Sequence, residues 1–228
     1  MPKRALSEKR PWLLASLAAA IAYYLLRDNP IPEPFLILLK GAGVGALAIY
    51  ALLRHAGADS RLLALAMALS ALGDMAIELW LEAGGALFFF AHLAAIALYL
   101  RHRRAALTPS QKIAAAALLV LTPVIAWLLP ADRELAPAIA VYALILGGMA
   151  CAAWSSAFNR YRVGLGAVLF VVSDLLIFAR LGTLAHSGVP DTLIWPIYYL
   201  AQLLICTGVI ASLRHRAEDQ GAGDQTGT

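Results

Sequence analysis

The chain has 228 residues, of which 61% are hydrophobic and only 14% are charged. Soluble domains carry about 25% charged residues, so this composition excludes an ordinary soluble protein and indicates that lipid surrounds the chain. The formal charge of +4 and the pI near 9.2 would suit a nucleic-acid partner. However, the basic residues lie in alternate loops between apolar segments, so we expect no nucleic-acid binding.

Eight apolar segments along the chain are candidates for membrane-spanning helices. A helix needs about 17 to 25 apolar residues to cross a bilayer, and the first segment is slightly shorter. We therefore predict an all-α integral membrane protein with eight transmembrane helices in one domain over residues 1–213. The predicted spans are Trp12–Leu26, Phe35–Leu53, Leu62–Leu81, Gly84–Leu100, Ile113–Leu129, Leu135–Phe158, Val163–Leu181 and Thr192–Leu213.

Both ends of the chain are polar. The basic head, MPKRALSEKR, is similar to the start of a signal peptide, but no small-residue cleavage site with a polar start follows it. We therefore expect a retained first helix. At the other end, residues 214–228 have the polar composition that is typical of a disordered tail.

The basic residues are divided unequally between the two sides of the predicted membrane domain. Fourteen precede the first span, lie in alternate loops or follow the last span, whereas the other loops hold only Arg27, Arg133 and Arg180. This asymmetry predicts that both termini face the cytoplasm. The alanine- and arginine-rich composition favours a bacterial cytoplasmic (inner) membrane.

Two aspartates lie in the third and seventh spans in similar frames. Asp74 is in ALSALGDMAIEL and Asp174 is in VLFVVSDLLIFA. A carboxylate inside a membrane is unfavourable by roughly 2.5 to 3.5 kcal/mol on insertion scales, so such residues are usually functional. The following spans also correspond, with His92 in FFFAHLAAI and Gln202 in YYLAQLLIC. We therefore predict a 4+4 parallel repeat with halves 1–107 and 108–213.

The polar residues inside the spans share one depth. With a rise of about 1.5 Å per residue, Asp74 lies about 10 Å from the outer end of its span, and Asp174 lies at a similar depth. The other polar residues in the same half of the membrane, or near its middle, are Lys40, Ser70, Glu78, His92, Tyr142, Ser173, Tyr198, Tyr199 and Gln202. This distribution predicts a polar cavity at one depth and not a line of charges that spans the membrane.

Neighbouring residues suggest how the two aspartates are supported. Ser70 and Glu78 flank Asp74 at four-residue spacing on one helical face, and Ser173 directly precedes Asp174. Lys40 is the candidate countercharge for both aspartates, which would favour a pair in which one carboxyl is protonated. The alternative interpretations are that Lys40 extends to the headgroups, that Glu78 is interfacial, and that the aspartates only hold helices together.

No cofactor or metal is expected. His92 with two distant acids is not a metal motif, and no Walker, Rossmann, HExxH or GxSxG sequence is present. Tyr198, Tyr199 and Gln202 follow one another at spacings that suggest a shared polar face, although the tyrosines would also suit an interfacial belt. The two cysteines lie in apolar stretches and read as core residues.

These residues together resemble the YhhN-like family, the lysoplasmalogenases. The resemblance extends from about residue 35 to residue 210 and departs from the family at Gly41, where a proline is expected. It implies an eight-helix membrane hydrolase that cleaves the vinyl-ether bond of lysoplasmalogen, with Asp74 and Asp174 as the catalytic acids. The motifs that carry the resemblance are LLKG, ALSALGDMAIE, FFFAH with Tyr99, VYALILGGM, LFVVSD and YYLAQLLI.

The chemistry of the predicted site agrees with this implication. A vinyl ether hydrolyses by protonation of its β-carbon, followed by the addition of water and collapse of the hemiacetal to an aldehyde and an alcohol. A carboxyl pair can supply the general acid, the base and nearby negative charge. Two other classes remain open, namely a proton-coupled secondary transporter and a membrane scaffold or sensor. The expected partners are lysoplasmalogen and membrane lipids, and the sequence leaves the oligomeric state open.

Overall fold

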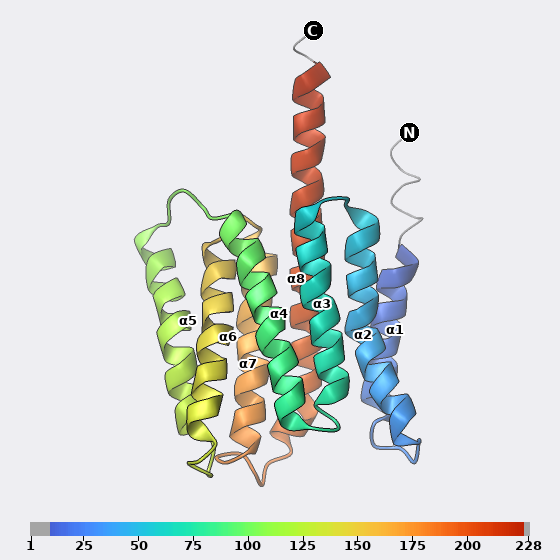
Figure 1. Cartoon of the computed structure of the whole chain (residues 1–228), viewed down its shortest axis with the longest axis vertical. Coiled ribbons are helices and arrows are strands. Elements are labelled where there is room, and N and C mark those ends of the chain that lie inside the picture. Colours follow the sequence, from blue (N-terminus) through green and yellow to red (C-terminus); the bar gives the residue numbers. More distant parts are fainter. Residues whose placement is uncertain (1–9, 226–228) are drawn as a thin grey trace.

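The computed structural model describes the backbone of residues 10–225 and the side chains of residues 11–219. Within this part the chain forms eight α-helices and no strand (Figure 1). The helices run up and down in a bundle, with α8 extending beyond it at the end where α1 begins. The helices are α1 (Arg10–Leu26), α2 (Glu33–Arg54), α3 (Ala58–Ala76), α4 (Leu81–Arg101), α5 (Pro109–Leu128), α6 (Ala136–Ser155), α7 (Leu165–Arg180) and α8 (Val189–Gln225).

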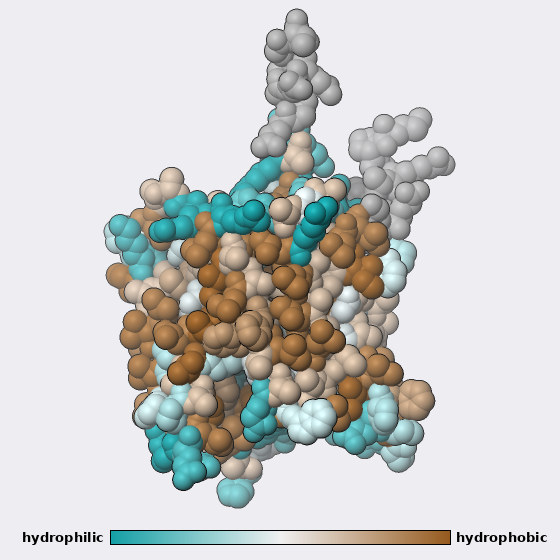
Figure 2. Space-filling view, viewed as in Figure 1, coloured by the Kyte–Doolittle hydropathy of each residue, from teal (hydrophilic) through white to brown (hydrophobic). Residues whose placement is uncertain are grey.

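Six of these helices are long and apolar enough to cross a membrane: α2, α4, α5, α6, α7 with the π-helical turn before it, and α8. α1 is apolar but has only 17 residues, and α3 is not among the six. On the face shown in Figure 2, an apolar belt crosses the middle of the bundle between two polar ends. Exposed leucines such as Leu38, Leu65 and Leu72 belong to this apolar surface. The chain is therefore a multi-pass membrane protein.

The packing of the helices leaves a central space that side chains fill. α1, α2, α3 and α4 pack in chain order, α5 packs on α6, and α7 packs on α8. α6 joins the two groups by contacting α4 and α7, while α8 contacts α2 and α3. Over the described residues, no close backbone contact joins α4 to α8. The large side chains between these two helices form part of the buried core.

Some helices begin or end at a different residue from the apolar segment that predicted them. α5 begins at Pro109, before the predicted start at Ile113, because Thr108 and Gln111 form a capping box. The third span was predicted to end at Leu81, but α3 ends at Ala76. The apolar run continues through a turn and an extended Trp80 into α4, so hydropathy alone misplaces this boundary.

α8 also departs from the prediction. Residues 214–225 continue the helix, although their composition had suggested disorder from residue 214. Two pairs at four-residue spacing support this extension, Arg214 with Glu218 and His215 with Asp219. Such pairs favour helix on a polar surface, where hydrophobic packing contributes nothing.

Glycines permit close helix packing, and Gly41 and Gly147 are two examples. A Cβ at Gly41 would lie 2.6 Å from Cγ of Met75, and a Cβ at Gly147 would lie 2.7 Å from the carbonyl oxygen of Leu118. The first contact joins α2 to α3 and the second joins α5 to α6. Gly148, in contrast, has only Ile96 nearby, at 3.7 Å, so its position accepts a methyl group.

Gly147→Ala should therefore destabilise the protein, and Gly148→Ala is its matched control. The added methyl group at Gly147 meets backbone of the neighbouring helix, which should lower the unfolding free energy by about 1–3 kcal/mol. At Gly148 the higher helix propensity of alanine acts without a clash. Thermal unfolding in detergent should show a lower midpoint for Gly147→Ala only. Equal midpoints for the two variants would contradict this account of the α5–α6 contact.

Candidate active site

Both aspartates lie inside the bundle, toward the end opposite to the extension of α8. Asp74 is in the last turn of α3 and is 3% exposed, while Asp174 lies six residues before the end of α7 and is 5% exposed. Because α3 ends at Ala76, Asp74 is nearer to its helix end than the sequence had indicated. A carboxyl buried to this degree requires hydrogen-bond donors.

Asp74 receives its hydrogen bond from α8. The Tyr198 hydroxyl donates to Oδ2 of Asp74 at 2.8 Å, and Nε2 of Gln202 donates to the Tyr198 oxygen at 3.2 Å. Tyr198 and Gln202 are four residues apart, so they project from the same face of α8. All three side chains are buried. Together they form one hydrogen-bonded network, which ends at the carboxyl.

Asp174 lies in a second network with the same order of groups. The Tyr142 hydroxyl, on α6, donates to Oδ2 of Asp174 at 2.6 Å, and Nε2 of His92, on α4, lies 3.1 Å from the Tyr142 oxygen. Tyr142 uses its single hydrogen for Asp174, so His92 acts as the donor through Nε2. The Ser173 hydroxyl oxygen lies 2.8 Å from the carbonyl oxygen of Phe170 and 3.3 Å from Oδ1 of Asp174, and its single hydrogen is shared between these two acceptors.

An aromatic wall joins the two networks. The Phe170 ring lies 4.9 Å from the His92 ring and 5.2 Å from the Tyr198 ring, measured between centroids. Phe88 packs edge-on against both Phe170 and Tyr198. The networks therefore belong to one buried site, formed by α3, α4, α6, α7 and α8.

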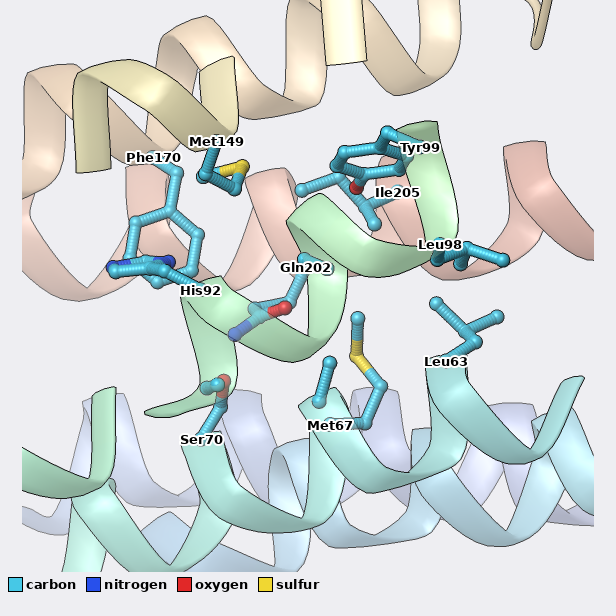
Figure 3. Close-up of a pocket in the computed structure, with 13 residues that line it drawn as sticks. Leu63, Met67, Ser70, His92, Leu98, Tyr99, Met149, Phe170, Gln202 and Ile205 are labelled. Carbon is cyan, nitrogen blue, oxygen red and sulfur yellow. The ribbon is translucent and has the colours of Figure 1, made fainter. Parts of the chain in front are cut away.

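An internal cavity of about 20 Å³ adjoins this site. In Figure 3, Ser70 and His92 lie at the left with Phe170 beside His92, Gln202 lies near the middle, and Leu63, Leu98 and Tyr99 lie at the right. A water molecule needs about 10–15 Å³, so the cavity has room for one beside these polar groups. The hydroxyl of Tyr99, which also lines the cavity, is buried without a hydrogen-bond partner in the described residues.

Lys40 contacts a different acid from the one expected. Its ammonium donates to Oε1 of Glu78, which lies in the turn after α3, and the Tyr23 hydroxyl donates to the same oxygen at 3.4 Å. The rings of Tyr23 and Trp195 lie 5.6 and 5.9 Å from Nζ of Lys40. Lys40 remains within electrostatic range of Asp74. The long side chain thus extends toward the polar end of the bundle, where Glu78 is its direct partner.

The remaining predicted residues divide between the site and its surroundings. Ser70 lines the cavity, but Tyr199 turns away from both aspartates and its hydroxyl lies 2.8 Å from that of Ser16 on α1. Consecutive residues of a helix point about 100° apart, so Tyr199 does not share the face of Tyr198. Sequence reasoning did not identify Tyr23 or Phe170, since aromatic residues in apolar helices usually form the core.

Residues 35–209 match the model of a protein family described as the YhhN family. The match covers more than half of the chain and includes every residue of the two aspartate networks. No curated protein and no solved structure matches the chain.

The ion pair between Lys40 and Glu78 should contribute to stability. The Lys40 side chain is 13% exposed and that of Glu78 is 35% exposed. Glu78→Gln leaves a nearly buried ammonium without its partner, which should lower the unfolding free energy by about 1–2 kcal/mol after allowance for solvent screening. The double variant Lys40→Met/Glu78→Gln should have a higher unfolding free energy than the sum of the two single-variant changes predicts.

Thermal midpoints in detergent measure this coupling, with the exposed pair of Arg214 and Glu218 as the control. Glu218→Gln should change the unfolding free energy by less than about 0.5 kcal/mol. Strictly additive effects of Lys40→Met and Glu78→Gln would mean that the two side chains do not stabilise each other.

Proposed function

Because the chain belongs to the YhhN family, we propose that it is a lysoplasmalogenase, a membrane hydrolase that cleaves the vinyl-ether bond of lysoplasmalogen. The products are a fatty aldehyde and glycerophosphoethanolamine or glycerophosphocholine. The observation that carries the proposal is the pair of buried carboxyls, each of which accepts a hydrogen bond from a tyrosine beside a shared interior.

The reaction consumes one water molecule and needs proton transfers both when water adds and when the hemiacetal breaks down. A general acid donates a proton to the β-carbon of the vinyl ether, which leaves an oxocarbenium ion at the carbon bonded to oxygen. A base then takes a proton from water as the water oxygen adds to that carbon. As the resulting hemiacetal collapses, a carboxylate takes the proton of its hydroxyl group, the glycerol oxygen receives a proton from a carboxyl, and the aldehyde is released. Two carboxyls in different protonation states perform the same roles in glycoside hydrolysis.

We assign the acid and base roles to Asp74 and Asp174. The tyrosine hydroxyls hold the two carboxyls in place, and the adjacent negative charge stabilises the oxocarbenium ion. The cavity beside Ser70, His92 and Gln202 would hold the attacking water. No cofactor enters this scheme.

The headgroup end of the substrate would lie at the polar end of the bundle. Lys40 and Glu78 offer one positive and one negative group there, which matches a zwitterionic glycerophospholipid. The cavity is too small for an alkenyl chain, so binding must separate side chains. The space between α4 and α8 is suited to this, because only side chains fill it. We therefore propose that the alkenyl chain of the substrate binds between α4 and α8.

The membrane arrangement completes the proposal. We propose eight spans with both termini in the cytoplasm of a bacterium, so that the protein lies in the inner membrane and the aspartates lie toward the outer leaflet. α1 and α3, with 17 and 19 residues, extend about 25 and 28 Å, close to the thickness of the hydrocarbon core. The matched positions of Asp74 and Asp174 support a 4+4 repeat.

Removal of either carboxyl should abolish turnover of a vinyl-ether lysolipid. General acid or base catalysis contributes about 10²–10⁴-fold, so Asp74→Asn and Asp174→Asn should each lose at least that factor. Tyr198→Phe and Tyr142→Phe should lose about 10–100-fold, because a hydrogen bond to a charged group is worth about 1.5–3 kcal/mol. The measurement is aldehyde release by purified protein, and Asp191→Asn is the control.

Asp191 is suitable because it lies at the same end of the bundle but is exposed, and Arg180 is its one ion-pair partner among the described residues. If both aspartate variants kept wild-type turnover, the mechanism would be wrong. Uptake of the lipid without product would indicate a transporter, and neither uptake nor product would indicate a scaffold. Preference for an ester lysolipid would keep the hydrolase class and exclude this substrate.

The position of bond cleavage can be traced with ¹⁸O-labelled water. Water adds to the vinyl carbon, so the glycerol oxygen stays with the glycerophospho product and that product should contain no label. Mass spectrometry of the product tests this expectation, and protein-free acid hydrolysis of the same lipid is the reference. Label in the glycerophospho product would instead indicate attack at the glycerol carbon.

A further inference from the structure

A second pocket, far from the aspartates, lies at the end of the bundle from which α8 extends. Its volume is about 420 Å³. The connection between α4 and α5 supplies Arg104, the connection between α6 and α7 supplies Asn159 and Arg160, and α8 supplies Arg216. Three segments that are distant in sequence thus bring three guanidinium groups to one pocket, which nothing in the proposed hydrolysis uses.

Arg216 is held in place by the surrounding structure. Its Nη1 lies 2.7 Å from Nδ1 of His102, and its Nη2 donates to the carbonyl oxygen of Ala157 at 3.2 Å. His102 in turn contacts Asp59 at 2.7 Å through Nε2. Asp59 therefore reaches Arg216 only through His102, and among the side chains that the structure describes no carboxylate contacts Arg216 directly.

Arg160 carries donors that lack acceptors. Its Nε and Nη2 are buried and have no hydrogen-bond partner among the described residues. The guanidinium lies 5.6 Å from the centre of the Trp154 ring, which supports the charge but accepts no conventional hydrogen bond. Over 90% of buried polar groups in folded proteins are paired. Unpaired guanidinium nitrogens beside a pocket therefore indicate a ligand with acceptor oxygens.

The chemistry of the pocket selects a phosphate group. A guanidinium binds phosphate oxygens through two parallel hydrogen bonds, and several arginines around one concavity favour a group with several such oxygens. The acid at the rim, Asp219, pairs with His215 at 2.8 Å, and both side chains are exposed. Asp219 is not among the residues that line the pocket, and none of those residues is acidic, so the pocket keeps its positive character.

The surroundings favour a lipid over a soluble phosphate. Tyr161, which lines the pocket, is 84% exposed, and Leu165 at the start of α7 is 43% exposed. Exposed aromatic residues beside an apolar surface are typical of the membrane interface. Basic pockets between transmembrane helices bind acidic headgroups. We propose that the pocket of Arg104, Arg160 and Arg216 binds the phosphate of an anionic phospholipid.

The experiment measures lipid binding to the full chain in detergent by native mass spectrometry, with phosphatidylglycerol as the probe. The wild-type protein should bind phosphatidylglycerol more tightly than phosphatidylcholine. Arg104→Gln/Arg160→Gln should weaken phosphatidylglycerol binding at least tenfold. Arg103→Gln removes an equal charge next to the pocket but not in it, so this control should bind like the wild type.

Folding is controlled in two ways. First, the thermal midpoint of each variant is measured in detergent. Second, Arg104→Gln is also tested alone. Among the described residues the Arg104 side chain makes no hydrogen bond or ion pair, and the backbone hydrogen bond of Arg104 to Ser155 does not depend on the side chain. Equal phosphatidylglycerol binding by wild type, Arg104→Gln and the double variant would overturn the proposal. If glycerol 3-phosphate bound as tightly as phosphatidylglycerol, the assignment to a lipid would be overturned.

Discussion

The hydrogen bond from a tyrosine to a buried aspartate is the contact on which the interior of this protein depends. A carboxyl without donors is strongly unfavourable in an apolar environment. Tyr198 satisfies Asp74 and Tyr142 satisfies Asp174, and each tyrosine oxygen lies beside a further nitrogen, from Gln202 or His92. These contacts join α3 to α8 and α4 to α6 and α7, so the polar groups also fix how the helices pack.

Each of the two aspartate networks contains residues from both predicted halves of the sequence. Asp74, in the first half, receives its hydrogen bond from Tyr198 in the second half. Asp174 belongs to the second half, but its network ends at His92 in the first. Phe170 then contacts the ring of one member from each network. Neither half therefore contains a complete network, and the site requires the packed bundle.

How far the sequence predicted this arrangement depends on the kind of contact. Apolar length located all eight helices, and four-residue spacing placed Tyr198 and Gln202 on one face. The sequence does not show that α3 ends at Ala76, because apolar residues continue through the turn that follows. The sequence also assigns Lys40 to the aspartates, whereas in the structure Lys40 pairs with Glu78 in that turn. The bond between Tyr142 and Asp174 joins different helices, so no spacing along the chain encodes it.

The position of the site near one polar end of an apolar belt has a consequence for the equilibrium of the proposed reaction. Cleavage there divides an amphiphile into two molecules that prefer different phases. The aldehyde keeps every CH₂ group, each worth about 0.8 kcal/mol in the bilayer, whereas the glycerophospho product has no chain and diffuses into water. Recombination would require both products to return to one place, so partitioning itself draws the hydrolysis toward completion.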